Sequence, residues 1–380
     1  YVGGQQFSLR ARAKNFDIEE LLQAVQYAHS LKRKIYVTVN IFAKNEDFKP
    51  LYDYFIKLRA IGVDAVIVSD PGVISLVREI VPDLETHVST QANTNNYRAA
   101  NFWKKTGVKR VILARELSFK EIAEIHEKEP DIALECFVHG AMCIAYSGRC
   151  LLSQYMTGRA SNRGECAHPC RYKYNLMEET RQGEYMPIEE DGRGTYIMNS
   201  KDLCMIEYLP EFIKAGVTGL KIEGRQKSVY YTAVVTRTYR AALDDYFIDP
   251  DKYEKNRQLY LNELLLTGSR DFTTGFYTGA TTAEAQIYGQ DKKSPGADFC
   301  GIVKSYDPET KFAVIEQRGK FSVGDKLEFF TSFGKDFNQT ITNMYDLNTN
   351  AIESAPHPRQ LVKIRTDHRV GEMDILRRRK

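Results

Sequence analysis

The sequence has 380 residues, enough for one barrel-sized domain of about 250 residues and a second module of under about 100. Hydrophobic residues make up 43% and charged residues 27%, and no apolar run approaches the roughly 20 residues that cross a bilayer, which excludes a membrane-spanning protein. The formal net charge of +3 excludes a strongly basic chain but permits a local basic face that contacts RNA.

The N-terminal part of the chain alternates apolar, β-branched runs with helical patterns. Helices are expected at residues 18–29, 51–61, 75–80, 97–106 and 118–129, and strands at residues 1–2, 34–39, 65–69, 85–89, 110–114, 134–138 and 219–224. Because Tyr1 lies inside this pattern, we expect a preceding strand that the sequence lacks. Eight such strands would close an α/β fold of the (β/α)8 type, a TIM barrel. A doubly wound sheet is the alternative, but no glycine-rich dinucleotide fingerprint follows any expected strand.

One segment interrupts this barrel, which is expected to span residues 1–267, and two segments follow it. Residues 141–193 are rich in Cys, Gly, Arg and Tyr and form an insertion, and long insertions of this kind are usually functional. Residues 228–266 are helical, and residues 268–297 form a linker. Residues 298–380 carry short alternating strands typical of a small β-barrel, ending in a basic tail that we expect to be solvated.

Four of the seven cysteines fall within the insertion, at Cys143, Cys150, Cys166 and Cys170. Such a compact group indicates reduced, metal-binding thiols in a cytoplasmic protein rather than a disulfide framework. Thiolates suit soft metals, and zinc sites favour cysteine pairs separated by two to four residues, a spacing that only the last pair has. We therefore favour an iron–sulfur cluster over zinc, with thiols that bind no metal as a third alternative. Cys204, expected at a helix start, could replace one ligand, while Cys136 and Cys300 are expected in the core.

Residues 135–174, ECFVHGAMCIAYSGRCLLSQYMTGRASNRGECAHPCRYKY, resemble the signature of the collagenase-like peptidases, family thirty-two of the peptidases of unassigned mechanism. Further blocks resemble the family in the same order: GGQQFSLRARAKNF, VTVNIFA, THVSTQANTNN, VILARELS, IMNSKDLC and LKIEGRQKS. Within the family the chain is most similar to the branch that hydroxylates the wobble uridine of tRNA to 5-hydroxyuridine with prephenate. Sister branches act on ribosomal RNA or on quinone precursors.

This resemblance implies several properties of the chain. The four cysteines of the insertion match a pattern that holds a four-iron four-sulfur cluster in the quinone branch. The C-terminal β-barrel is similar to the second domain of elongation factor Tu. The implied partners are tRNA and a small organic acid such as prephenate, and the oligomeric state stays open.

A metal-dependent, collagenase-like peptidase is the alternative function. The sequence has neither a His-Glu-x-x-His zinc helix nor a Gly-x-Ser-x-Gly nucleophile elbow. Cys143 follows His139 by four residues, which permits a Cys–His nucleophile. A thiol among three others is better explained as a metal ligand, so we favour the RNA hydroxylase.

Polar side chains near expected strand ends are the candidate site residues, because catalytic groups in such barrels follow the strands. For catalysis these are His87, Gln91, Glu135 and His139; a hydrogen-bonded core histidine is the alternative for His87. Arg10 and Arg12 would clamp a dicarboxylate, or be plain surface arginines. Lys221, Glu223 and Arg225 alternate and should share one face of the last strand as a substrate site, unless they only pair with one another. An RNA surface is expected from the basic and aromatic residues of the insertion, which could also be simply solvated: Arg159, Arg163, Arg171, Tyr172, Lys173 and Tyr174.

Overall fold

The computed structural model describes residues 1–380 except residues 9–14, 144, 148, 172–174, 177–185, 188–198, 226, 269, 280–285, 288–294 and 333–334. The chain forms two compact units. The first comprises Tyr1–Gln226 and Asp271–Gln290, and the second comprises Lys227–Arg270 and Asp291–Lys380. Within the described ranges, every helix is too short or too polar to serve as a membrane span.

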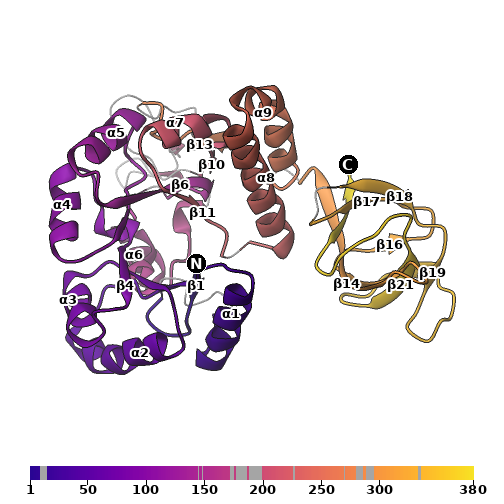
Figure 1. The fold of residues 1–380 in the computed structure, drawn as a ribbon, viewed down its shortest axis with the longest axis horizontal. Helices are drawn as coiled ribbons and strands as arrows, with labels where there is room; N and C mark the ends of the chain where they lie inside the picture. The colour runs from indigo at the N-terminus through magenta and orange to yellow at the C-terminus, as the bar shows by residue number, and fades with distance from the viewer. Residues whose placement is uncertain are drawn as a thin grey trace. The chain divides into compact units, whose positions relative to one another are not determined.

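The first unit is built on a parallel sheet whose strands follow one another in chain order (Figure 1). All seven strands predicted from the sequence are present: β1 (Val2–Gly3), β2 (Tyr36–Thr38), β3 (Ala65–Val68), β4 (Glu85–Val88), β5 (Arg110–Ile112), β6 (Ala133–Ala141) and β11 (Gly219–Ile222). Each pairs in parallel with its neighbour, β11 with β6. A doubly wound sheet reverses its strand order part-way, and this order has no reversal, so the fold is α/β with a singly wound parallel sheet.

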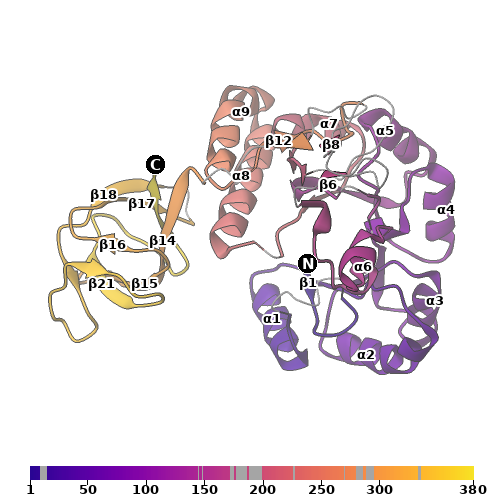
Figure 2. The same cartoon turned by 180° about the vertical axis from the view of Figure 1, so that it is seen from behind.

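The helices between these strands cover the outer side of the sheet, as both views show (Figures 1 and 2). They are α1 (Ile18–Ser30), α2 (Phe48–Ala60), α3 (Pro71–Ile80), α4 (Tyr97–Lys105) and α5 (Phe119–Lys128), close to the predicted ranges. Side chains of Asp17, Asp70, Asn96 and Ser118 cap four of the helix N-termini by accepting backbone N–H bonds. The helices bury apolar faces against β-branched strand residues such as Val37, Val66 and Val88, which are fully buried.

β6 is longer than the other strands of this sheet, and its carboxyl end has a further partner besides β5 and β11. β10 (Asp202–Cys204) pairs with it in antiparallel fashion, and β12 (Phe272–Thr273) pairs with β10. Two expectations are therefore corrected: Cys204 lies in a strand rather than at a helix start, and the expected linker contains a strand. The remaining elements of this unit are α6 (Leu152–Thr157), α7 (Leu209–Lys214), β7 (Asn175–Leu176), β8 (Met186–Pro187), β9 (Asn199–Ser200) and β13 (Gln286–Ile287), with short 3₁₀ turns that include η1 (Asn45–Asp47).

The second unit combines two helices with an antiparallel sheet. The helices are α8 (Val229–Ile248) and α9 (Pro250–Leu265), separated where Asp249 caps α9 and Pro250 begins it. Seven strands form the sheet in the order β18-β17-β22-β14-β15-β21-β19: β14 (Ala297–Asp307), β15 (Phe312–Gln317), β17 (Lys326–Phe330), β18 (Phe337–Thr340), β19 (Met344–Tyr345), β21 (Leu361–Arg365) and β22 (Ile375–Arg379). β16 (Phe321–Ser322) and β20 (Ser354–Ala355) form a separate pair. The sheet encloses a core that includes Cys300, Phe321, Phe329 and Ile364.

The expected basic tail is instead the strand β22. Arg377 is fully buried, donates to Glu328 Oε2 at 2.9 Å and also pairs with Glu263 of α9. The prediction of a solvated tail is therefore wrong for Arg377, whose charge is balanced by the buried Glu328 and the partly buried Glu263. The same contacts group α8 and α9 with the C-terminal sheet, whereas the sequence assigned residues 228–266 to the first domain.

Candidate functional site

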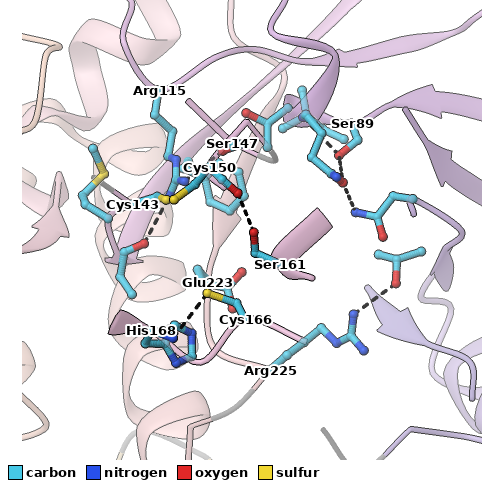
Figure 3. Close-up of a pocket in the computed structure, with 18 of the residues that line it drawn as sticks. Ser89, Arg115, Cys143, Ser147, Cys150, Ser161, Cys166, His168, Glu223 and Arg225 are labelled. Atoms are coloured by element: carbon cyan, nitrogen blue, oxygen red, sulfur yellow. Dashed lines mark hydrogen bonds between the residues drawn. The ribbon is translucent and has the colours of Figure 1, made fainter. Parts of the chain in front are cut away.

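A cavity of about 190 Å³ opens at the carboxyl ends of the parallel strands in the first unit (Figure 3). Its walls come from the ends of β2, β4, β5, β6 and β11 and from the cysteine loop, which we define as residues 142–170. The carboxyl ends of parallel strands are where such folds gather their functional groups, because the loops that follow the strands converge there. The cavity is smaller than the roughly 300–1,000 Å³ of drug-sized pockets and fits a small molecule or a single base.

Cys143, Cys150, Cys166 and Cys170, the four cysteines proposed as ligands, all line this cavity. Figure 3 shows Cys143, Cys150 and Cys166 around one hollow with Arg115, Glu223 and Arg225. The Cys166 sulfur accepts the backbone N–H of His168 at 3.4 Å, a contact common at metal-bound thiolates. Across the described ranges, no three His, Cys, Asp or Glu side chains are arranged as a metal site. The donor set thus suits a soft metal, although its ligands are not drawn together in this structure.

The other three cysteines lie away from the cavity lining. Cys136 and Cys300 are buried in their sheets with exposed fractions of 1% and 0%, which confirms the prediction that they belong to the core. Burial raises the pKa of the Cys300 thiol to about 11. Cys204 is also buried.

Two arginines fasten the cysteine loop to neighbouring parts of the first unit. Arg163 donates from both terminal nitrogens to Asp47 of η1, at 3.0 and 3.2 Å, and to the Phe42 carbonyl at 3.0 Å. The hydrogen bond from Arg163 lowers the pKa of Asp47. Arg115 donates to the Ala141 carbonyl at 3.0 Å and to Ser147 Oγ at 2.9 Å. Arg163, which the sequence suggested for RNA, therefore serves to hold the loop.

Lys221, Glu223 and Arg225 all line the cavity, as their alternation predicts. Glu223 accepts the Tyr1 hydroxyl at 3.0 Å, while Arg225 donates to Ser8 Oγ at 2.9 Å and to Thr38 Oγ1 at 3.1 Å. These bonds join the end of β11 to the region of β1 and β2. The close approach requires glycine, because a Cβ on Gly3 would lie 1.9 Å from the Arg225 guanidinium.

Glu135 lies below the cavity in a buried ion-pair network. It accepts Lys221 Nζ at 2.8 Å and Arg110 Nη1 at 3.0 Å, and its side chain is 7% exposed. Burial alone would raise the pKa of Glu135, but Lys221 and Arg110 overcome it and lower the pKa to about 2. Glu135 is therefore a fixed anion that neutralises Lys221, and it is not among the residues that line the cavity.

The two candidate catalytic histidines are both buried and outside the cavity lining. His87 is 0% exposed, contacts Glu85 Oε1 at 2.8 Å and packs edge-on against Tyr36. Burial lowers the pKa of His87, so the imidazole is neutral and fills the core. His139 is 1% exposed and packs its ring against Phe272. Gln91, in contrast, does line the cavity.

Several of the residues proposed from the sequence lie outside the described part of the chain or have only their backbone described. Arg10, Arg12, Tyr172, Lys173 and Tyr174 lie outside the described residues, and for Arg171 only the backbone is described, in η4 (Pro169–Arg171). Arg159 is partly buried and donates to the Glu165 carbonyl at 3.0 Å, within the cysteine loop itself.

Arg115 also lines the cavity, although it is not among the candidate residues predicted from the sequence. It follows β5 directly, so the rule that selected the other polar residues after strands would also have selected it. Its two hydrogen bonds go to neutral oxygens, and among the described residues no carboxylate forms an ion pair with it. Arg115 thus carries a positive charge available to an anionic ligand.

Comparison with known proteins places the chain in a family. Residues 1–287 match Peptidase family U32, and residues 295–377 match the Peptidase family U32 C-terminal domain. The chain is 41% identical to tRNA hydroxylation protein P1 of Bacillus subtilis, over 100% of this chain and 89% of the relative. It is 38% identical to tRNA hydroxylation protein P of Escherichia coli, over 94% and 86% of the two chains. It is 35% identical to an uncharacterized protease of Methanocaldococcus jannaschii, over 98% and 91%. The chain is a member of peptidase family U32 and resembles its tRNA hydroxylation proteins.

Proposed function

We propose that this protein is an RNA-modifying enzyme that hydroxylates a uridine of tRNA, the wobble uridine in particular, to 5-hydroxyuridine. The observation that carries the proposal is that four cysteines and several cations line one small cavity at the strand ends. The names of the B. subtilis and E. coli relatives, which align with nearly the whole chain, support hydroxylation of tRNA, while the choice of the wobble uridine is part of the proposal.

The cationic wall of the cavity suits a small organic dianion such as prephenate. Arg115 and Arg225 present guanidinium groups, which bind carboxylates through paired N–H bonds. Lys221 is neutralised by Glu135, so it contributes less charge than its position suggests. In this proposal Arg115 replaces Glu135 as a principal site residue, while Arg10 and Arg12 keep their proposed role as further clamps.

Cys143, Cys150, Cys166 and Cys170 would hold a four-iron four-sulfur cluster, with zinc as the alternative metal. Such a cluster, when bound, supplies one-electron transfer next to the substrate cavity. The protein's own part is to hold the loop by Arg163 and Arg115 and to donate the His168 N–H to the Cys166 sulfur. We also propose that the parallel sheet is part of a closed (β/α)8 barrel, which the side-chain bridge between β11 and the region of β1 and β2 supports.

The contacts of His139 weigh against one form of the peptidase alternative, in which Cys143 and His139 act as a pair. A Cys–His peptidase needs an imidazole within reach of its thiol. His139 is buried against Phe272, whereas Cys143 is exposed at the cavity. The small cavity also suits a single base better than an extended peptide chain.

The deciding experiment is mass spectrometry of tRNA nucleosides from a strain that lacks the gene. We expect 5-hydroxyuridine and its derivatives to disappear, the intact gene to restore them, and Cys166→Ala to fail. Cys300→Ala removes a core thiol of the second unit and should still restore the modification. An unchanged nucleoside profile, together with gelatin cleavage by the purified protein, would support the peptidase instead.

A further inference from the structure

The cavity has a second wall whose chemistry differs from that of the cationic one. It is formed by the carboxyl ends of β2 and β4, and it carries neutral amide and hydroxyl groups: Thr38, Asn40, Ser89, Thr90 and Gln91. Carboxylates favour cations such as Arg115, whereas neutral carbonyl groups are well matched by amide and hydroxyl donors. This neutral wall therefore suits an uncharged, hydrogen-bonding part of a ligand, such as a nucleobase.

The amide of Gln91 is held in one orientation on this wall. Its Oε1 accepts Asn40 Nδ2 at 2.5 Å and Ser89 Oγ at 3.3 Å. Ser89 Oγ accepts in turn the backbone N–H of Gln91 at 3.4 Å, because Ser89 caps the 3₁₀ turn η2 (Thr90–Ala92). With the oxygen used twice, the amide of Gln91 offers only its NH₂ group to a ligand.

That NH₂ group has no hydrogen-bond partner in the part of the chain that the structure describes. Gln91 is 3% exposed, and its Nε2 is shielded from solvent. A buried amide donor without an acceptor costs free energy, which a ligand oxygen placed against the wall would recover. The arrangement is typical of a binding site whose acceptor arrives with the ligand.

We propose that Gln91 recognises the target base, by donating from Nε2 to the O4 carbonyl of uracil. This inference rests on the proposed function and names the part of the site that selects the base. Cytosine carries an amino group in place of O4, so its N–H donors would face the N–H donors of Gln91 Nε2 and no hydrogen bond would form. Asn40 and Ser89 are positioning residues, since they act by fixing the amide of Gln91.

Gln91→Glu tests the inference because it changes the hydrogen-bonding character without changing the shape. One carboxylate oxygen still accepts from Asn40 and Ser89, while the other replaces the donor by an acceptor. The probes are two synthetic anticodon stem-loops with uracil or cytosine at the wobble position, and Kd is measured by fluorescence anisotropy. We expect the unchanged protein to prefer the uracil probe by about 10-fold, and Gln91→Glu to lose or reverse that preference.

Gln258→Glu is the matched control, since Gln258 is exposed on α9 and donates to Asn262 of the same helix. It should keep the preference of the unchanged protein. Fluorescence of Trp103, the single tryptophan of the chain, checks that the first unit, which carries the cavity, is folded in each variant.

The outcomes separate this inference from the proposed function. If the unchanged protein binds neither probe, the proposed function fails. If it binds both probes equally, or if Gln91→Glu keeps the uracil preference, the inference about Gln91 is overturned while the function stands. If Gln91→Glu weakens binding of prephenate and leaves the base preference intact, the ligand oxygen belongs to the organic acid, and base recognition by Gln91 is overturned.

Discussion

Glu135 shows how one buried carboxylate sets the charge of the cavity floor. It lies between Lys221 and Arg110, whose side chains are 9% and 21% exposed, and neutralises charge that the sheet would otherwise have to bury. Its role is thus to keep Lys221 in place in the cavity wall. The chemistry of the cavity is left to the groups above it, such as Arg115 and Arg225.

Replacing Glu135 by Gln should destabilise the first unit in a pH-dependent way. The pKa of about 2 in the folded protein lies below the ordinary 4.5, so the ionised carboxylate stabilises the fold. This contribution is complete above about pH 5 and is lost as the pH falls toward 2. At pH 7 the variant leaves Lys221 and Arg110 without their anion, at a cost of about 3–5 kcal/mol.

Urea unfolding followed by Trp103 fluorescence measures this effect, because Trp103 lies in α4 of the first unit. The difference in the free energy of unfolding between the unchanged protein and Glu135→Gln should become smaller from pH 7 to pH 3. Glu79→Gln, an exposed change on α3, should leave the free energy of unfolding unchanged at both pH 7 and pH 3. A difference in the free energy of unfolding that stays constant over this range would show that the ion pairs do not lower the pKa of Glu135.

At this scale the sequence predicts which face a side chain is on, but not how deep it lies. Alternation placed Lys221, Glu223 and Arg225 on one face, and all three line the cavity. The same alternation grouped His87 with Gln91, yet only Gln91 lines it, because His87 is one layer lower and packs against Tyr36. Depth depends on how neighbouring strands are staggered, and that is a property of the sheet rather than of one strand.

Among the elements, the cysteine loop depends most on contacts distant in sequence. The bidentate pair between Arg163 and Asp47 joins residues far apart in the chain, and Ser161 Oγ donates to the Cys150 carbonyl at 2.6 Å. A planar guanidinium that meets both carboxylate oxygens fixes direction as well as distance. This pair therefore orients the segment between Cys150 and Cys166.

Asp47→Asn should loosen the cysteine loop without unfolding the sheet. The amide keeps the shape of the carboxylate but removes the charge and one acceptor for Arg163. In metal-free protein, we expect alkylation of Cys150 and Cys166 by iodoacetamide to speed up several-fold. The free energy of unfolding in urea, followed by Trp103 fluorescence, should fall by only about 1 kcal/mol, as for other partly exposed ion pairs.

Glu46→Gln is the control for this experiment, because it removes the adjacent exposed carboxylate and leaves the Arg163 pair intact. Its alkylation rates should match those of the unchanged protein. Equal rates for Asp47→Asn would mean that the loop is held by its other contacts, such as those of Arg115.

The helices and strands that the sequence predicts correctly are those with a clear pattern in their own residues. The seven parallel strands carry β-branched runs, and their helices carry capping residues. β10 and β12 were missed because two or three residues show no period, and they are strands only through pairing with distant segments. β22 was missed because its arginines read as a polar tail, although Glu328 and Glu263 neutralise Arg377.

For the molecule as a whole, the first unit does not depend on the cysteine loop for its core. The sheet core is made by strand and helix residues such as Val66, Val111 and Leu134, all fully buried. The loop itself is fastened by hydrogen bonds and ion pairs of protein groups, among them those of Arg163 and Arg115. A metal bound there would thus join a unit that is already folded, unlike a zinc finger, in which binding energy is folding energy.

Metal removal should accordingly abolish the proposed activity but spare the fold. Protein purified without oxygen is expected to be brown and to contain iron, and Cys166→Ala to lose most of both. After oxidation and chelation, thermal unfolding followed by Trp103 fluorescence should shift by no more than a few degrees, a change of about 1 kcal/mol or less. Zinc in place of iron, together with loss of the Trp103 transition on chelation, would instead identify a structural zinc site. That outcome would remove electron transfer from the proposed function, because zinc has no redox chemistry.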